Sequence, residues 1–382
     1  MITKNDLTEY FFQGIKSKHD MRIGVEHEKF ILNKNSLMPI TYDEKNGIKD
    51  ILQKFISLGW TPSYDDNEET IIALKKGKEA ITLEPGGQIE LSGAPLDNIH
   101  ETCEETTNHL REVKSLSEEF NFILLGMGVE PNLTVDDFPW MPKQRYSIMK
   151  KYMMQVGTLG HHMMKRTCTN QVNIDYCSED DMNDKFRLML NLESIATAIF
   201  SNSPFDQGSI SKYKSLRSHF WHHTDQDRTG LIPFVFNKGF NFEKYTDYAL
   251  NVPMYFVTRK NKYIDMTKYT FKDYLKGRST DIKYEVTIKD WEDHLTTLFP
   301  QARLKQYLEI RSMDACNWDL ICSQPAFWIG ILYDTEIMDS VKNICEGWTK
   351  EDREYLNKNV PAQGLQTEFK SKKIINLAQE FY

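Results

Sequence analysis

The chain has 382 residues, of which 40% are hydrophobic and 12% aromatic, so it can bury a large core and has room for two or three domains without requiring them. Its 47 basic and 55 acidic residues give a formal net charge of −8, which provides no general attraction to nucleic acids or anionic membranes. Polyanions and membranes are therefore not expected partners, whereas small phosphates held by local arginines and a metal ion are compatible with this balance.

The N-terminal 20 residues lack the apolar core of a signal peptide, and no apolar run approaches the roughly 18 residues of a membrane span. We therefore expect a soluble, cytoplasmic protein. The six cysteines form no CxxC pair and have no histidine at a spacing suited to zinc, so we expect them to be reduced and mostly structural. No repeat, low-complexity tract or Pro/Gly/Ser linker divides the chain, which favours one compact domain over residues 1–382.

The first predicted strand, GVEHEKF at residues 24–30, follows an amphipathic helix over residues 5–17. Side chains alternate between the two faces of a strand, so Glu26 and Glu28 share one face, with roughly 6–7 Å between their attachment points. Two carboxylates this close need a cation, a proton or water between them, and a divalent metal ion is a good solution. For an isolated pair, a solvent-facing strand edge is the simpler interpretation.

A second polar pair lies in EAITLEPGGQIELSGAP, residues 79–95, where two alternating runs flank a Pro-Gly-Gly turn and predict a hairpin. Glu84 stands at the entry of the turn and Glu90 on the strand that leaves it. A surface turn explains these carboxylates equally well, but glycines here would also let a ligand approach the backbone.

Helices are predicted on either side of this hairpin. One lies within residues 42–58. The other covers residues 97–121, with Asp97 as its N-cap and its acidic run, Glu101, Glu104 and Glu105, on a solvated face. The following FILLGMGVEP indicates a buried strand.

The stretch QVNIDY, residues 171–176, predicts a strand that places Gln171, Asn173 and Asp175 on one face. That face suits ligand-facing oxygens better than bare solvent. A helix follows from Ser178, and the loop beyond it, residues 215–230, concentrates Arg217, Trp221 and Arg228 among turn residues, a composition typical of substrate-holding loops.

The last polar strand, QYLEIRSMD at residues 306–314, places Glu309 and Arg311 on one face, where the simplest interpretation is an ion pair in solvent. Four predicted strands thus share one pattern, with an apolar face and a face of acids, amides or arginine. A solvated sheet face usually carries Thr, Lys and Ser, whereas this one gathers Glu. A curved antiparallel sheet lined in this way would bind Mg²⁺, and Mg²⁺ would bring a nucleoside triphosphate.

Seven motifs together resemble glutamate–cysteine ligases of the plant and proteobacterial type, from about residue 20 to 365. They are GVEHEKF, TLEPGGQIELSGAP, VGTLGHHMMKRTCTNQVNIDY, SNSPF, SLRSHFWHHTDQDRTG, DYALNVPMYF and RLKQYLEIRSMD. The resemblance implies an α+β fold of the glutamine-synthetase-like carboxylate-amine ligase class, with a curved antiparallel sheet cradle and helices packed outside.

The same resemblance implies the reaction. The γ-carboxylate of L-glutamate would attack the γ-phosphate of ATP, and L-cysteine would capture the resulting γ-glutamyl phosphate, giving γ-glutamylcysteine, ADP and phosphate, the first step of glutathione biosynthesis. Mg²⁺ is the expected metal, with Mn²⁺ as an alternative because carboxylates accept both. Glutamate, cysteine and ATP are the expected partners of a monomer or weak homodimer.

Carried over residue by residue, the resemblance assigns roles to the polar positions above. Arg311 would face the transferring phosphate, Arg217 would hold a glutamate carboxylate, and Arg228 would be a further anion contact. Trp221 and Tyr255 would form the wall of the cysteine pocket, and Gln171 and Asn173 would complete the metal shell or touch substrate. The implied metal ligands are Glu26, Glu28, Glu84, Glu90 and Glu309.

The chain departs from the plant members at Met266, where they carry a cysteine, and a second expected cysteine about fifteen residues further on is also missing. The plant-type regulatory disulfide at this place is therefore not expected, and a dimer switch built on it is in doubt.

Two alternatives stay open. A related ligase could join glutamate to a different amine, and a silent homologue could serve as a binding protein, although the acidic cluster that catalysis needs is intact.

Overall fold

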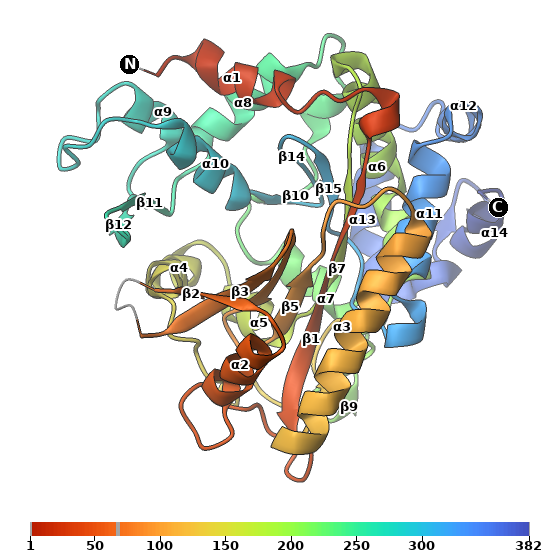
Figure 1. Cartoon of the computed structure of the whole chain (residues 1–382). Coiled ribbons are helices and arrows are strands. Elements are labelled where there is room, and N and C mark those ends of the chain that lie inside the picture. Colours follow the sequence, from red (N-terminus) through yellow and green to blue (C-terminus); the bar gives the residue numbers. More distant parts are fainter. Residues whose placement is uncertain (1, 66–68, 382) are drawn as a thin grey trace.

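The computed structural model describes residues 2–65 and 69–381, and a large antiparallel sheet organises it (Figure 1). Its strands follow the order β14-β15-β7-β1-β5-β4-β3-β2, and β6 pairs with the end of β1. The central strand β1 (Ile23–Asn33) contains the GVEHEKF motif, and its first half lies between β7 and β5. The α+β class with a large antiparallel sheet is therefore confirmed.

The remaining strands of this sheet are β2 (Thr61–Tyr64), β3 (Ile71–Lys76), β4 (Glu79–Leu83), β5 (Ile89–Ser92), β6 (Phe122–Leu125), β7 (Asn170–Ile174), β14 (Ala302–Leu304) and β15 (Leu308–Ile310). Short two-stranded sheets are formed by β8 (Phe205–Asp206) with β9 (Ser209–Ile210), β10 (Thr229–Gly230) with β13 (Phe299–Pro300), β11 (Phe256–Arg259) with β12 (Lys262–Asp265), and β16 (Glu368–Phe369) with β17 (Lys372–Lys373).

The α-helices are α1 (Lys4–Phe12), α2 (Ile48–Ser57), α3 (Ile99–Phe120), α4 (Gln144–Val156), α5 (Gly160–Arg166), α6 (Glu179–Ile199), α7 (Leu216–His222), α8 (Phe242–Asn251), α9 (Phe271–Leu275), α10 (Ile288–Thr296), α11 (Ser323–Leu332), α12 (Thr335–Ile344), α13 (Lys350–Gln363) and α14 (Ile374–Gln379). Short 3₁₀ turns are η1 (Lys18–Asp20), η2 (Pro233–Phe236), η3 (Trp318–Leu320) and η4 (Gly364–Gln366). None of the helices in the described ranges is long and apolar enough to cross a membrane.

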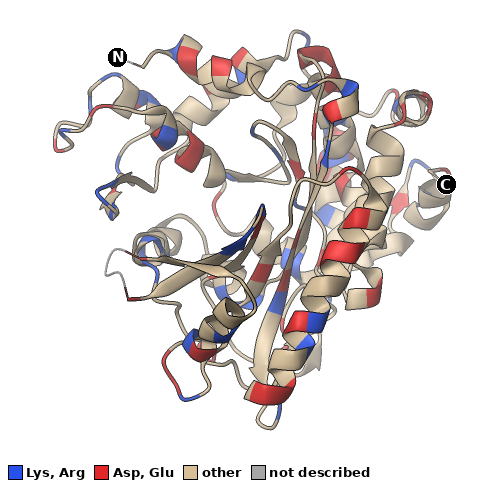
Figure 2. Ribbon diagram, in the orientation of Figure 1, with Lys and Arg blue, Asp and Glu red and all other residues tan. Residues whose placement is uncertain are grey.

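Alternation along β1 gives the sheet two different sides. His27 packs against His109 of α3, with ring centroids 5.6 Å apart, so this position faces the helix layer. In Figure 1, α3 and α11 run along β1, and α3 carries repeated acidic segments in Figure 2. Glu26 and Glu28 alternate with His27 and therefore face the other side of the sheet.

Two large apolar clusters hold these elements together. One lies around α6 and includes the apolar residues of β7, β14 and β15, together with α1, α8 and α10. The other joins α2 to β3, β4 and β5 and reaches α4. Apolar residues of β7 and β15 thus belong to the first cluster and those of β4 and β5 to the second, so the strands on either side of β1 are held by different clusters.

Several predicted elements differ in detail. The first helix ends at Phe12 rather than near residue 17, and α2 begins only at Ile48. The N-cap of α3 is Asn98, whose side chain accepts hydrogen bonds from the backbone N–H groups of the first turn, and not Asp97. Glu105 was predicted on a solvated face, but its side chain is buried. There its carboxylate accepts a hydrogen bond of 2.7 Å from the Ala94 backbone N–H.

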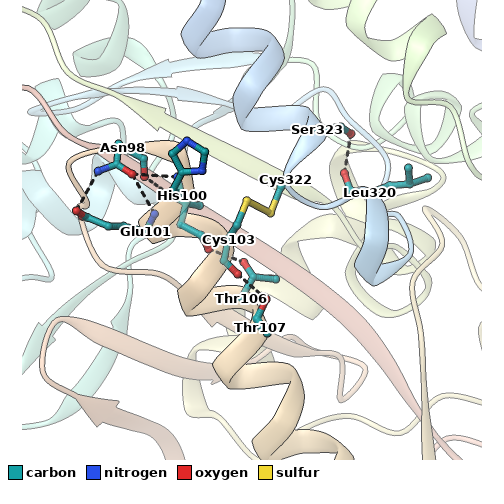
Figure 3. The surroundings of a disulfide bond; sticks show 10 residues. Asn98, His100, Glu101, Cys103, Thr106, Thr107, Leu320, Cys322 and Ser323 are labelled. Carbon is teal, nitrogen blue, oxygen red and sulfur yellow. Dashed lines mark hydrogen bonds between the residues drawn. A yellow bond between two sulfur atoms is a disulfide. The ribbon is translucent and has the colours of Figure 1, made fainter.

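The prediction that all six cysteines are reduced is wrong for two of them. Cys103 in α3 and Cys322 at the start of α11 form a disulfide, with 5.9 Å between their Cα atoms, which is within the range such bonds require (Figure 3). The two residues are 219 positions apart, so spacing in the sequence gave no sign of the pair. The other four cysteines are free, as predicted.

Candidate active site

The polar side of the sheet lines a cavity of about 280 Å³. Residues from β1, from β4 and β5 and from the turn between these two strands form one part of its wall. Residues from α4, α7 and β14, together with Lys305 and Arg311 on either side of β15, form another. Eight of the residues predicted from sequence lie in this wall: Glu26, Glu28, Glu84, Glu90, Gln171, Arg217, Trp221 and Arg311. The predicted cluster is therefore assembled from three distant segments of the chain.

Strand register explains why the carboxylates meet. Glu28 of β1 is directly opposite Glu90 of β5 in the antiparallel ladder, and Glu26 is directly opposite Gln171 of β7. Directly opposite side chains have attachment points roughly 4.5–5.5 Å apart. Glu84 joins the cavity from the Pro-Gly-Gly turn, where the Gly87 backbone N–H donates to the Glu84 carbonyl and closes a tight turn.

The pKa values of Glu26, Glu28 and Glu90 are raised. Burial is the largest cause at Glu26, whose pKa rises to about 7, and the charges of Glu309 and Glu90 add to it. Burial together with Glu84 and Glu90 raises the pKa of Glu28 well above its usual value. The pKa of Glu90 is also raised, by burial and by Glu84. These acids share one poorly solvated space that favours a proton or a metal ion between them.

Hydrogen bonds fix the direction of three of these carboxylates. The side-chain amides of Asn173 and Gln171 donate to the two oxygens of Glu26 at 3.0 and 3.1 Å. The Thr169 backbone N–H donates to Glu28 at 2.9 Å. At Glu90, the hydroxyls of Thr82 and Ser92 donate at 3.0 and 2.6 Å. Asn173 lies outside the cavity wall and positions Glu26 rather than facing a ligand.

Basic side chains dominate the β14–β15 end of the cavity. Arg303 of β14 donates two hydrogen bonds from one nitrogen to the oxygens of Glu309, at 2.6 and 2.8 Å, and Arg311 donates to the same carboxylate. Burial works against the charged form of Glu309, but these two guanidinium groups outweigh it and hold its pKa well below its usual range. Glu309 is fully buried behind the cavity wall, so the geometry favours a counter-ion role over the predicted role as a metal ligand.

Arg217 reaches the cavity from the first turn of α7. Its guanidinium donates to the Arg311 carbonyl at 2.9 Å and forms no ion pair within the described residues. Behind it, buried Asp314 accepts hydrogen bonds from the hydroxyls of Ser203 (2.6 Å) and Ser215 (2.8 Å). Ser215 caps α7, and the Ser203 hydroxyl accepts from the Arg217 backbone N–H at 3.2 Å. This network directs the guanidinium of Arg217, which has no ion-pair partner among the described residues, towards the cavity.

Two predicted substrate contacts lie outside the cavity wall. Arg228 is fully buried, its guanidinium lies 3.8 Å from the centroid of the Tyr255 ring, and its Nε donates to Asp225 at 2.7 Å. Tyr255 is itself buried beneath the wall, whereas its neighbour Phe256 lines the cavity. The structure therefore places both residues as support for the wall. Trp221, by contrast, faces the cavity as predicted.

Sequence reasoning missed three cationic residues of the wall, Arg145, Arg303 and Lys305. Arg145 lies in the first turn of α4, and its Nε is buried with no hydrogen-bond partner in the described structure. Nothing in the local sequence singled it out. Lys305 could have been found, because Arg303, Lys305, Glu309 and Arg311 are all spaced by even numbers along the RLKQYLEIRSMD motif.

The described residues contain no group of three or more His, Cys, Asp or Glu side chains arranged to hold a metal ion on their own. The acids of the cavity nevertheless fit Mg²⁺ in their chemistry, because they offer hard carboxylate oxygens close to one another. Mg²⁺ commonly uses one or two protein carboxylates and completes its octahedron with water and substrate phosphates. The arrangement fits a metal that arrives with a phosphate-bearing substrate.

Comparison with known proteins decides the family. The model of glutamate–cysteine ligase family 2 matches residues 22–381. The chain belongs to this family. Among its relatives, the rice glutamate–cysteine ligase B, named chloroplastic, is 50% identical over 381 residues, covering 99% of this chain and 76% of the rice protein. The corresponding Arabidopsis thaliana enzyme is 48% identical over 384 residues and is covered to 72% of its length.

A solved structure agrees with this glutamate–cysteine ligase fold. The enzyme of Francisella tularensis, described in complex with AMP, matches with a TM-score of 0.51 at 12% sequence identity, covering 96% of this chain and 77% of that protein. The fold and the ligase family inferred from the motifs are thus confirmed, and the chain is an enzyme of the ligase class. The predicted cytoplasmic localisation is contradicted, because the plant relatives are named chloroplastic.

Proposed function

We propose that this member of the glutamate–cysteine ligase family joins L-glutamate to L-cysteine at the cavity of the central sheet. The γ-carboxylate of glutamate attacks the γ-phosphorus of ATP, ADP leaves, and γ-glutamyl phosphate forms. The amine of cysteine then attacks the acyl carbon, phosphate leaves with the bonding electrons, and the amine releases a proton. The observation that carries the proposal is a single cavity whose wall brings four carboxylates together with five cationic side chains, of which Arg217 and Lys305 form no ion pair among the described residues.

The acidic end supports a metal site. We assign Mg²⁺ to Glu26, Glu28, Glu84 and Glu90, with Mn²⁺ as an alternative, and Glu309 to the charge balance behind them. Bound with ATP, Mg²⁺ would neutralise phosphate charge that otherwise repels an incoming carboxylate. The protein's part is to hold three of these acids, Glu26, Glu28 and Glu90, in fixed directions through hydrogen bonds from Asn173, Gln171, Thr169, Thr82 and Ser92.

The cationic residues would orient the two anionic substrates. Arg311 stands at the phosphate, where a guanidinium stabilises charge on the group in transfer. Arg217 suits a carboxylate of glutamate, because a planar guanidinium can grip a carboxylate with two parallel hydrogen bonds. Arg145 lies in the same wall, forms no ion pair with another described residue, and is a second candidate for that carboxylate. Trp221 and Phe256 give the cavity an apolar surface for the acceptor.

The test is a turnover assay with ATP, Mg²⁺ and glutamate, with and without L-cysteine, in which phosphate release is measured and the product is identified by mass. We expect cysteine-dependent phosphate release and γ-glutamylcysteine. Turnover with a different amine only would keep the ligase chemistry and change the acceptor. No phosphate release with any amine would overturn the proposal. A monomer or weak homodimer remains our expectation, which sedimentation would check.

A further inference from the structure

Lys305 occupies the turn between β14 and β15, and its side chain lines the cavity. Its ammonium donates to the Tyr307 hydroxyl at 2.7 Å. Among the described residues no carboxylate oxygen lies within ion-pair distance of this ammonium, although it is partly buried. A partly buried ammonium with only a neutral phenol beside it has an unmet preference for an anion.

The backbone of this turn is held firmly. The Tyr176 hydroxyl lies at hydrogen-bond distance from the carbonyls of Phe11 (2.7 Å) and Lys305 (3.1 Å), which ties the turn to α1. The Gln306 side-chain amide donates to the Tyr10 carbonyl at 3.2 Å. A side chain at Gly14 would come within 2.5 Å of the Gln306 carbonyl, so the α1 segment packs closely on the turn. The backbone that carries the Lys305 side chain is therefore held in position.

The surroundings of Lys305 carry a surplus of positive charge. Arg303 and Arg311 share the single carboxylate of Glu309, so that one of these two cations is not neutralised. Lys305 adds another positive charge. Even when the negative charge of Glu26 is counted, one net positive charge remains. Burial lowers the pKa of Lys305, whereas the carboxylates of Glu309 and Glu26 raise it, so a bound anion would favour the charged form further.

We propose that Lys305 binds the phosphate chain of the nucleotide. This inference rests on the proposed function and adds to it the location of the phosphates, at the β14–β15 end of the cavity. A polyphosphate carries several negative charges. It therefore matches a group of three cations better than a single carboxylate of an amino-acid side chain does. The compact ammonium of lysine also suits phosphate oxygens as a point charge, whereas Arg217 has the planar geometry that a carboxylate prefers.

The test compares Lys305→Gln and Lys305→Arg with Lys283→Gln, a matched change at an exposed lysine outside the cavity wall. In the turnover assay we expect Lys305→Gln to raise the KM for ATP about 10- to 100-fold, as loss of one charge-assisted hydrogen bond predicts, and the KM for glutamate less than about 2-fold. Lys305→Arg should recover part of the loss, and Lys283→Gln should match the wild type.

A binding measurement separates this inference from the reaction itself. Calorimetric titration with MgADP and with magnesium pyrophosphate should show weaker binding to Lys305→Gln than to the wild type, in the absence of turnover. Thermal unfolding of each variant checks the fold, and Lys305→Arg provides the test if the glutamine variant is unstable. Unchanged binding and an unchanged KM for ATP, or an equal rise in the KM for glutamate, would overturn the inference. Absence of γ-glutamylcysteine in the wild type would overturn only the proposed function.

Discussion

Glu90 and Glu309 are both acids of the same sheet face, but their surroundings predict different consequences of losing the charge. Glu90 has two hydroxyl donors and a raised pKa, so Glu90→Gln should keep or slightly increase stability while reducing turnover at least about 100-fold. Glu309 neutralises Arg303 and Arg311, so Glu309→Gln should cost about 3–5 kcal/mol of folding free energy as well. Urea unfolding and turnover on both variants check this, and equal stability losses would contradict it.

Glu193 of α6 shows how a buried acid outside the cavity makes stability depend on pH. Among the described residues, Ser194 and Asn357 donate to its carboxylate, and burial raises its pKa from 4.5 to about 7. Between these pH values the folded state holds a proton that the unfolded state has released, so stability falls by roughly 3 kcal/mol as the pH rises through this window. Glu193→Gln should flatten that fall.

Free energies of unfolding measured from pH 4 to 8 would show the change. Glu104→Gln, at an exposed position of α3, is the matched control and should leave the wild-type slope intact. A Glu193→Gln variant with the same slope as the wild type would mean that other buried acids carry this dependence.

At the scale of the elements, the disulfide joins two helices that both pack along β1. Cys103 of α3 and Cys322 at the start of α11 close a loop of 219 positions, so the bond restricts the unfolded chain strongly. The double variant Cys103→Ser/Cys322→Ser should lose about 2–5 kcal/mol of stability. Thermal unfolding with and without a reducing agent tests this, since the wild type should respond to reduction and the double variant should not.

The elements also show what sequence could and could not predict. The strands with Glu26, Glu90 and Gln171 were found because period-two alternation is a local pattern. The start of α6 at Ser178 was also predicted, because the residues that favour a helix start are a local pattern too. The disulfide depends on residues 219 positions apart, and the pairing of Glu309 with Arg303 depends on the register of the β14–β15 hairpin, so neither was predicted. Arg145 faces the cavity only because α4 packs there, and its own neighbours carry no sign of that.

For the whole molecule, the cavity lies where three segments meet: residues 26–90, residues 145–171 and residues 217–311. A ligand that contacts all three should stabilise the complete fold, because binding to the native state alone adds RT ln(1 + [L]/Kd) to its stability. Mg²⁺ should act on the acidic end in particular, where Glu26, Glu28 and Glu90 repel one another once they are ionised.

Mg²⁺ with ADP should therefore raise the midpoint of thermal unfolding more than either alone, by an amount worth about 3 kcal/mol at 100 times the Kd. The pKa of Glu26 rises to about 7, so protons compete with the metal below that value, and the gain from Mg²⁺ should be larger at pH 8 than at pH 6. Scanning calorimetry with a chelator as the metal-free reference measures both effects. An equal gain at the two pH values, or an undiminished gain in Glu90→Gln, would place the metal elsewhere than on these carboxylates.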